Sequence, residues 1–144
     1  MKILMLLAGV PLLAQTAKLP NWAGAGAMFS NPGFTAVGAM AVPVVSSAQL
    51  YSFTLYQEGF AAGKLTTTTS TGLDECLKTF KVAGGTAMVH GILTFGVTTT
   101  TTSTTGTFPY GGGVTWAAKG WAPGAFVIKN SGKTSLMIIV GRYW

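Results

Sequence analysis

Short segments in which apolar residues alternate with threonine, serine or glycine constrain the fold of this chain more than any other feature. In residues 87–98 every odd position holds an apolar residue or glycine, whereas the even positions include His90 and Thr94. In residues 107–116 the even positions are mostly apolar or aromatic, and the odd positions are mostly small or hydroxylated. Because successive side chains of a strand point to opposite faces, this alternation predicts strands with one apolar and one small, polar face.

Turn-forming residues divide the chain from residue 22 onward into segments of strand length. Clear turn signals lie at 30–33, 84–85 and 130–133. Strands are expected at about 22–29, 34–45, 48–57, 64–80, 86–98, 106–117, 122–130 and 134–144. This order predicts an all-β fold, a single antiparallel up-and-down β-barrel of about eight strands. In the segment 64–80, Gly72 allows either one bent strand or two strands, so the count holds to within a pair.

The composition bears on what surrounds such a barrel. Charged residues make up 8% of the chain, against roughly 25% in ordinary soluble domains. The polar faces carry threonine, serine and glycine, whereas a soluble barrel needs a charged exterior. A membrane-embedded barrel is therefore favoured, with an exported soluble barrel as the alternative. The nine basic residues are scattered from Lys2 to Arg142 without a basic stripe, so no nucleic-acid partner is expected.

The first residues have the layout of a secretory signal peptide. Lys2 precedes an apolar run that ends at Ala14, and this run is shorter than the roughly 20 residues of a membrane-spanning helix. We expect cleavage after Ala14, with Ala17 as second choice, and a barrel domain over residues 15–144. An uncleaved anchor or a buried N-terminal helix remains the alternative. No later segment is long and apolar enough for a spanning helix.

The last residues add a more specific signal. The chain ends in an apolar strand on Tyr143 and Trp144. Together with the signal peptide and the alternating strands, this ending resembles the C-terminal signature of bacterial outer-membrane β-barrel proteins, whose terminal aromatic residue is read by the barrel insertion machinery. Arg142 departs from that pattern, which has an aromatic or apolar residue there, and Gly141 does not meet the usual glycine spacing.

The resemblance implies a Gram-negative outer-membrane protein of the small eight-stranded class, whose interior is about filled by side chains. Its implied partners are outer-membrane lipid and, through the C-terminal strand, the insertion machinery. A structural or interaction role is the expected function. The alternatives are an exported soluble barrel, periplasmic or extracellular, that binds a small apolar ligand, and a narrow solute channel.

The alternation also assigns faces to individual residues. We expect His90, Thr94 and Thr115 to face the lumen. Candidates for the aromatic girdles of a membrane barrel are Phe108, Tyr110, Trp116 and Trp144. The threonine-rich tracts 66–69 and 98–105 are expected to be solvated hairpin ends beyond the membrane, with a sugar-contacting tip as the alternative.

Few residues are equipped for chemistry, since the chain has one His and three Asp or Glu residues in all. A catalytic triad would need Asp74 to orient His90 beside a serine or Cys76, and no spacing argument brings them together. We expect Asp74 and Glu75 at a rim or paired with Lys78 or Lys81, and Cys76 buried. The sequence therefore predicts no enzyme, no catalytic residue, no cofactor and no metal site.

Overall fold

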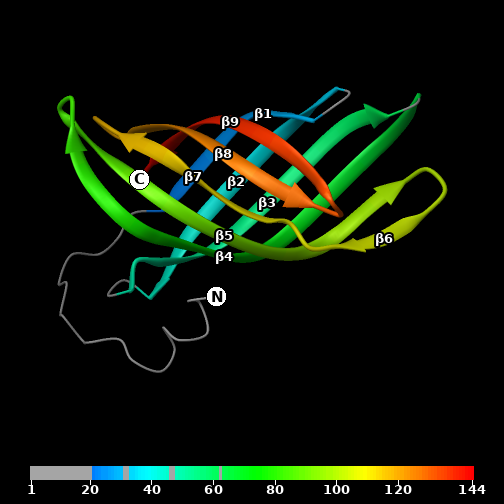
Figure 1. Ribbon diagram of the computed structural model, residues 1–144, viewed down its shortest axis with the longest axis horizontal. Coiled ribbons are helices and arrows are strands. Elements are labelled where there is room, and N and C mark those ends of the chain that lie inside the picture. The colour runs from blue at the N-terminus through cyan, green and yellow to red at the C-terminus, as the bar shows by residue number, and fades with distance from the viewer. Residues whose placement is uncertain (1–20, 31–32, 46–47, 62) are drawn as a thin grey trace.

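A computed structural model shows an all-β closed barrel and describes residues 21–30, 33–45, 48–61 and 63–144 (Figure 1). The predicted signal peptide, residues 1–14, and both of its cleavage sites lie outside the described residues. The strands are β1 (Trp22–Phe29), β2 (Phe34–Val45), β3 (Leu50–Ala61), β4 (Lys64–Val82), β5 (Gly85–Thr100), β6 (Thr104–Thr107), β7 (Tyr110–Ala117), β8 (Trp121–Asn130) and β9 (Lys133–Tyr143).

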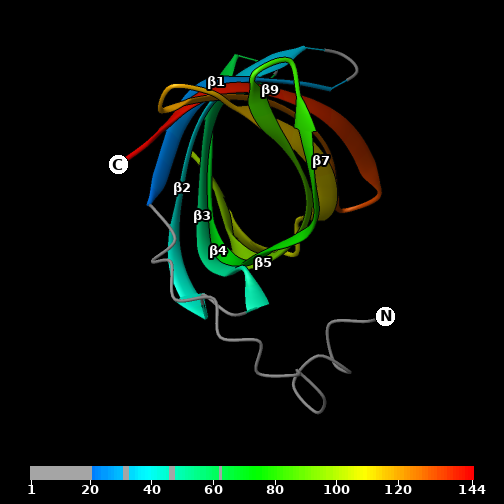
Figure 2. The same ribbon diagram turned by 90° about the vertical axis from the view of Figure 1, so that its left-hand side faces the viewer.

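Every strand pairs antiparallel with its neighbours in the wall, and β1 pairs with β9 to close the ring (Figure 2). Strands β6 and β7 both pair with β5, one after the other, and count as a single wall strand. The nine segments therefore form eight strands, which confirms the predicted antiparallel eight-stranded barrel.

The interruption between β6 and β7 falls at Phe108 and Pro109. Proline has no backbone N–H and cannot donate to the ladder. Thr94 of β5 bridges the break, since its backbone N–H donates to the Pro109 carbonyl at 2.9 Å and its hydroxyl donates to the same oxygen at 3.0 Å. The sequence places one continuous strand here, and proline explains the difference.

The long segment after residue 64 is one strand, β4, of 19 residues. Its irregularity lies between Cys76 and Lys78, where Leu77 is an extra residue opposite β5. Gly72 instead stays within the ladder, and a Cβ there would collide with the Leu93 carbonyl. The single-strand alternative is therefore correct, with a β-bulge at Leu77 and no division at Gly72.

The wall is uneven in height. Strands β4 and β5 have 19 and 16 residues, whereas β1 and β7 have 8 each. A transmembrane strand needs roughly 9–11 residues, so β4 and β5 extend past the band that the shorter strands define (Figure 1). Three connections are two-residue turns with positive φ at both positions, at Ala83-Gly84, Lys119-Gly120 and Ser131-Gly132, as expected of type I′ hairpins.

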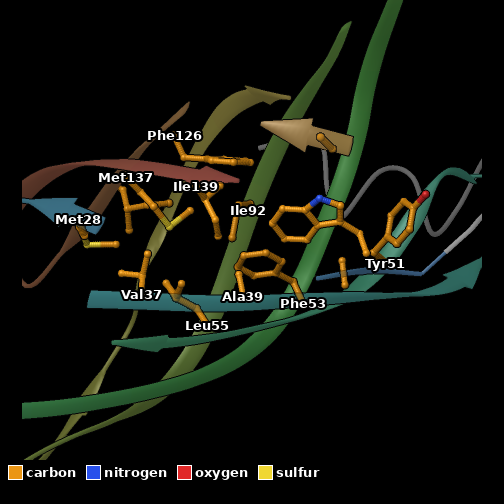
Figure 3. Packing of buried hydrophobic residues seen from close by; sticks show 14 residues of the cluster. Met28, Val37, Ala39, Tyr51, Phe53, Leu55, Ile92, Phe126, Met137 and Ile139 are labelled. Carbon is orange, nitrogen blue, oxygen red and sulfur yellow. The ribbon is translucent and has the colours of Figure 1, made fainter. Parts of the chain in front are cut away.

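The two faces of the wall differ in packing rather than in hydrophobicity. The inner face packs Phe53, Leu55, Phe126, Met137 and Ile139, each at most 2% exposed, into the centre of the barrel (Figure 3). The outer face exposes large apolar side chains around the whole ring, including Phe34, Phe60, Phe95, Val127, Ile138 and Val140. Continuous apolar exposure of this kind marks a surface in contact with lipid or a partner.

Among the residues that the structure describes, no helix is long and apolar enough to cross a membrane.

Candidate functional site

Three polar side chains form a hydrogen-bonded chain inside the barrel. They are Asp74 on β4, His90 on β5 and Thr115 on β7, and all three are buried. Nδ1 of His90 lies 3.0 and 3.1 Å from the two carboxylate oxygens of Asp74. Nε2 of His90 lies 2.8 Å from Oγ1 of Thr115. The carboxylate therefore orients the imidazole, and the imidazole contacts a hydroxyl group.

The strand register brings these residues together. Across β4 and β5, Cys76 is directly opposite His90, so Asp74 is the diagonal neighbour of His90 on the same face. Across β5 and β7, Gly113 is opposite His90, and Thr115 is the next inward residue. Diagonal neighbours in a sheet are within reach of long side chains. Gly113 has no side chain, and the ring of Phe126 occupies the space beside it. The centroids of the His90 and Phe126 rings are 5.7 Å apart.

The bulge at Leu77 puts Asp74 on this inner face. From the β4–β5 turn to Lys78, the even-numbered residues of β4 pair with outward-facing residues of β5, as Phe80 does with Ala87. One extra residue reverses that alternation. Beyond the bulge the even-numbered residues, including Asp74, face inward. Without the bulge, Asp74 would point away from His90.

Two sequence-based expectations are therefore wrong. Asp74 was expected to lie apart from His90, yet the two form an ion pair if His90 is protonated, and it is the one ion pair among the described residues. Asp74 and Glu75 were expected at a rim or beside Lys78 or Lys81, and both are buried. The expectation that Cys76 is buried is confirmed.

A small cavity adjoins the three residues. Its volume is about 10 Å³, and its lining includes Trp22, Tyr51, Tyr143 and the hydrogen-bonded chain itself. That space holds about one water molecule. Nε1 of Trp22 is buried and has no hydrogen-bond partner among the described residues.

A larger hollow lies at the mouth of the barrel, at the end where β1 begins and β9 ends. Its volume is about 450 Å³, and Tyr51 and Tyr143 line both this vestibule and the inner cavity. The two tyrosines therefore separate the polar chain from the open end. No group of three or more His, Cys, Asp or Glu residues with metal-binding geometry occurs in the part of the chain that the structure describes.

The other residues singled out from the sequence lie as follows. His90, Thr94 and Thr115 are 6%, 0% and 2% exposed and face the interior, although Thr94 bonds only to the Pro109 carbonyl. Phe108, Tyr110, Trp116 and Trp144 are exposed on the outside. Phe108 packs against Phe95 near the threonine-rich end, with ring centroids 4.5 Å apart. At the opposite end, Nε1 of Trp116 donates a hydrogen bond to the Val82 carbonyl. Their role as membrane girdles remains a prediction.

The closed eight-stranded wall, the filled interior and the apolar exterior define the class of small outer-membrane β-barrels. No protein-family model matches the sequence, and no curated protein matches it. Solved structures of this class do match. The N-terminal β-barrel domain of Pseudomonas aeruginosa OprF is 12% identical with a TM-score of 0.62, and the match covers 88% of this chain and 98% of that chain.

Two further structures show the same architecture. The outer membrane enzyme PagL is 15% identical with a TM-score of 0.50, over 85% of this chain and 97% of that chain. Ail, the attachment invasion locus protein of Yersinia pestis, is 8% identical with a TM-score of 0.42, over 88% of this chain and 99% of that one. The closed eight-stranded wall and the match to the OprF domain show that this protein has the outer-membrane β-barrel fold.

The expectation that the protein is not an enzyme is overturned by this comparison. PagL is an outer membrane enzyme, and its structure is similar to that of this chain. The barrel fold is thus compatible with catalysis. The strand register also brings Asp74, His90 and Thr115 together, although the spacing of Asp74 and His90 in the sequence did not predict it.

Proposed function

We propose that this protein resides in the outer membrane and has a structural or interaction role there, carried by its outer face and its protruding strands. The packed interior is the observation that supports this role. Phe53, Leu55, Phe126 and Met137 fill the barrel from three different strands, β3, β8 and β9. A barrel of eight strands has an interior about wide enough for its own side chains, so solute flux is disfavoured.

The tall part of the wall offers the interaction surface. Strands β4 to β6 carry threonine to its top, with Thr66 opposite Thr100 and Thr67 opposite Thr99. Thr68 and Thr98 join their hydroxyls at 2.7 Å on the inner side. Hydroxyl groups at this density favour contact with polar partners such as sugars and peptide backbones, because each hydroxyl both donates and accepts.

The insertion machinery is proposed as a partner during assembly, through the C-terminal strand. Trp144 is exposed, and its backbone pairs with that of Asn21 at 3.1 and 3.2 Å, at the β1–β9 closure. The last residue therefore lies where the ring closes. Deleting Trp144 should slow insertion in cells while leaving refolding into vesicles nearly unchanged. Equal loss in both settings would contradict a role in recognition.

A conductance measurement tests the proposed role against the channel alternative. Residues 15–144 are refolded into vesicles and fused to a planar bilayer. We expect no steady conductance from the unaltered barrel, and measurable conductance from the double variant Phe53→Ala, Phe126→Ala, which empties the centre. Steady current through the unaltered barrel would establish a channel. A chain that stays folded and monomeric without detergent or lipid would establish the soluble alternative.

The hydrogen-bonded chain favours a second candidate function, ester hydrolysis by acyl transfer. In that reaction Oγ1 of Thr115 attacks the ester carbonyl while Nε2 of His90 accepts its proton. His90 then returns the proton to the leaving alkoxide, and water hydrolyses the acyl-threonine. Asp74 orients the imidazole, and Trp22, whose Nε1 has no hydrogen-bond partner among the described residues, lines the same cavity.

This second function requires that an ester substrate can reach the Thr115 hydroxyl. The inner cavity admits about one water molecule, so an ester reaches Thr115 only if Tyr51 or Tyr143 moves. Hydrolysis of short p-nitrophenyl esters by the folded barrel is the measurement. Hydrolysis that Thr115→Val abolishes and Thr115→Ser retains supports the candidate. Equal rates in all three proteins would refute it, provided that each variant refolds.

A further inference from the structure

Two turns converge over the mouth of the barrel at the end where β1 begins and β9 ends. They are the β4–β5 turn at 82–85 and the β7–β8 turn at 118–121. These two turns, the second of which contains Lys119, line an open hollow of about 530 Å³ together with Lys81. This hollow shares Thr86, Ala117, Ala118 and Lys119 with the vestibule of about 450 Å³. The two hollows therefore form one recess, here called the basic vestibule.

The described lining of the basic vestibule has two positively charged side chains, Lys81 and Lys119, and no acidic side chain. Asp74 and Glu75 are buried, and Asp74 is already paired with His90. Two cations from separate turns, without a carboxylate among the lining residues, create a positive potential that attracts anions.

One of the two cations is held in place. Nζ of Lys81 donates to Oγ1 of Thr86 at 2.8 Å, across the β4–β5 hairpin. An ammonium group has three donors, so this bond leaves two of them available. Lys119 occupies the left-handed position of its turn with φ of 52°, and a two-residue turn fixes its backbone relative to the barrel wall.

The inner part of the basic vestibule is aromatic and apolar. Tyr51, Met88 and Tyr143 lie there, between the lysines and the inner cavity. The hydroxyl of Tyr143 donates to Sδ of Met88 at 3.8 Å, and a thioether sulfur is a weak acceptor. An incoming oxygen would therefore be a better partner for this hydroxyl. A ligand that fits this recess combines an anionic head with an apolar body.

We propose that the basic vestibule binds a phosphate-bearing amphiphile, with the phosphate between Lys81 and Lys119 and the apolar part against Tyr51, Met88 and Tyr143. Lysine binds phosphate as a point charge and needs no fixed fork geometry, which suits two side chains that reach in from separate turns. The phosphate could belong to the headgroup of a membrane phospholipid or to a soluble phosphate ester. This inference does not depend on the structural or interaction role proposed above.

Three small probes test the site on the folded barrel in neutral detergent. Hexyl phosphate carries both features of the proposed ligand, inorganic phosphate carries the head alone, and 1-hexanol carries the apolar body alone. Binding is measured by calorimetry. We expect hexyl phosphate to bind more tightly than either partial probe. Equal affinity for inorganic phosphate would overturn the amphiphile, and equal affinity for hexanol would overturn the phosphate site.

Matched lysine variants locate the binding. In Lys81→Gln, Lys119→Gln, the affinity for hexyl phosphate should fall by about fivefold for each lysine removed. The control is Lys64→Gln, Lys133→Gln, which removes two lysines next to turns at the opposite end of the barrel. The control should bind as the unaltered protein does. The same loss in both double variants would overturn the proposal, because it would reflect net charge alone.

A vesicle experiment separates the two sources of phosphate. The protein and both double variants are refolded into phosphatidylcholine vesicles with and without phosphatidylglycerol. A gain in folded yield with phosphatidylglycerol that only Lys81→Gln, Lys119→Gln loses assigns the site to a lipid headgroup. Hexyl phosphate binding without such a gain assigns it to a soluble ester. Absence of both effects in a barrel that folds would contradict the site.

Discussion

The two halves of the barrel interior are built differently. Toward the β1–β2 hairpin, Leu55, Ile128 and Met137 are at most 1% exposed and belong to the apolar core cluster, and the buried polar side chains there, such as Ser70 opposite Leu55, are uncharged. Toward the end where β1 begins and β9 ends, the interior holds the Asp74–His90 pair, a cavity and an open vestibule. Figure 3 shows Tyr51 at the opposite end of the cluster from Met28 and Leu55. We infer that the apolar half provides stability, and that the polar half is where ligands or substrates meet the barrel.

Leu55→Ala should have the largest effect on stability, because it empties space in the apolar half. Leu55 has no exposed surface, and a substitution of this kind costs about 2–5 kcal/mol. Urea titration of the barrel refolded in vesicles measures the loss. A loss below about 1 kcal/mol would mean that this half is not tightly packed, and the contrast between the halves would disappear.

Leu93→Arg should have the next largest effect, because it places a charge on the lipid-facing side of β5. Near the bilayer midplane an arginine costs about 2–4 kcal/mol, and the cost falls to about 0–1 near the interface. Val97 faces outward on the same strand, closer to the threonine-rich end of the barrel, so Val97→Arg is the matched control. Folding into vesicles should be impaired much more by the first substitution. Equal effects would refute the assignment of depth.

The sequence predicted the faces of the wall well, because alternation is a local property. Phe95 faces outward and Thr94 inward simply because they are neighbours on one strand. The turn residues likewise marked the hairpins at 84–85 and 130–133. These features predicted the closed eight-stranded barrel without any knowledge of long-range contacts.

The candidate site was missed because it depends on register between strands. Asp74 meets His90 only through the one-residue bulge at Leu77, and no turn-forming residue near Leu77 signals a bulge. Thr115 joins them from a third strand. The proline at position 109 did signal a break, since it cannot donate to a ladder, and the division of β6 from β7 was foreseeable on that ground.

His90→Ala should have a moderate effect, because it leaves a buried carboxylate without its partner. A buried group that loses its hydrogen bond costs about 1–3 kcal/mol. Asp74→Ala should also destabilise, and the double variant should lose less than the sum of the two single losses. This double-mutant cycle, measured by urea titration, checks the pairing. Additive losses would show that the two side chains do not interact.

Thr99→Ala with Thr104→Ala should have the smallest effect. These residues face each other across β5 and β6 at the exposed end, where surface substitutions usually change stability by less than about 0.5 kcal/mol. The same titration measures the change. A larger loss would mean that the protruding hairpin contributes to the stability of the barrel, in contrast to its proposed role in surface contact.

Quenching of tryptophan fluorescence by brominated lipid shows whether the outer face of the barrel is in contact with acyl chains. Trp116 is 37% exposed on the outside, whereas Trp22 is 4% exposed and lies inside. Two variants, in which Trp22 or Trp116 is the single tryptophan and the other three of the four are replaced by phenylalanine, are refolded into vesicles with brominated acyl chains. If the outer face is in lipid, we expect strong quenching of Trp116 and little quenching of Trp22. Equal quenching of both, or none of Trp116, would contradict a barrel with its apolar side in lipid.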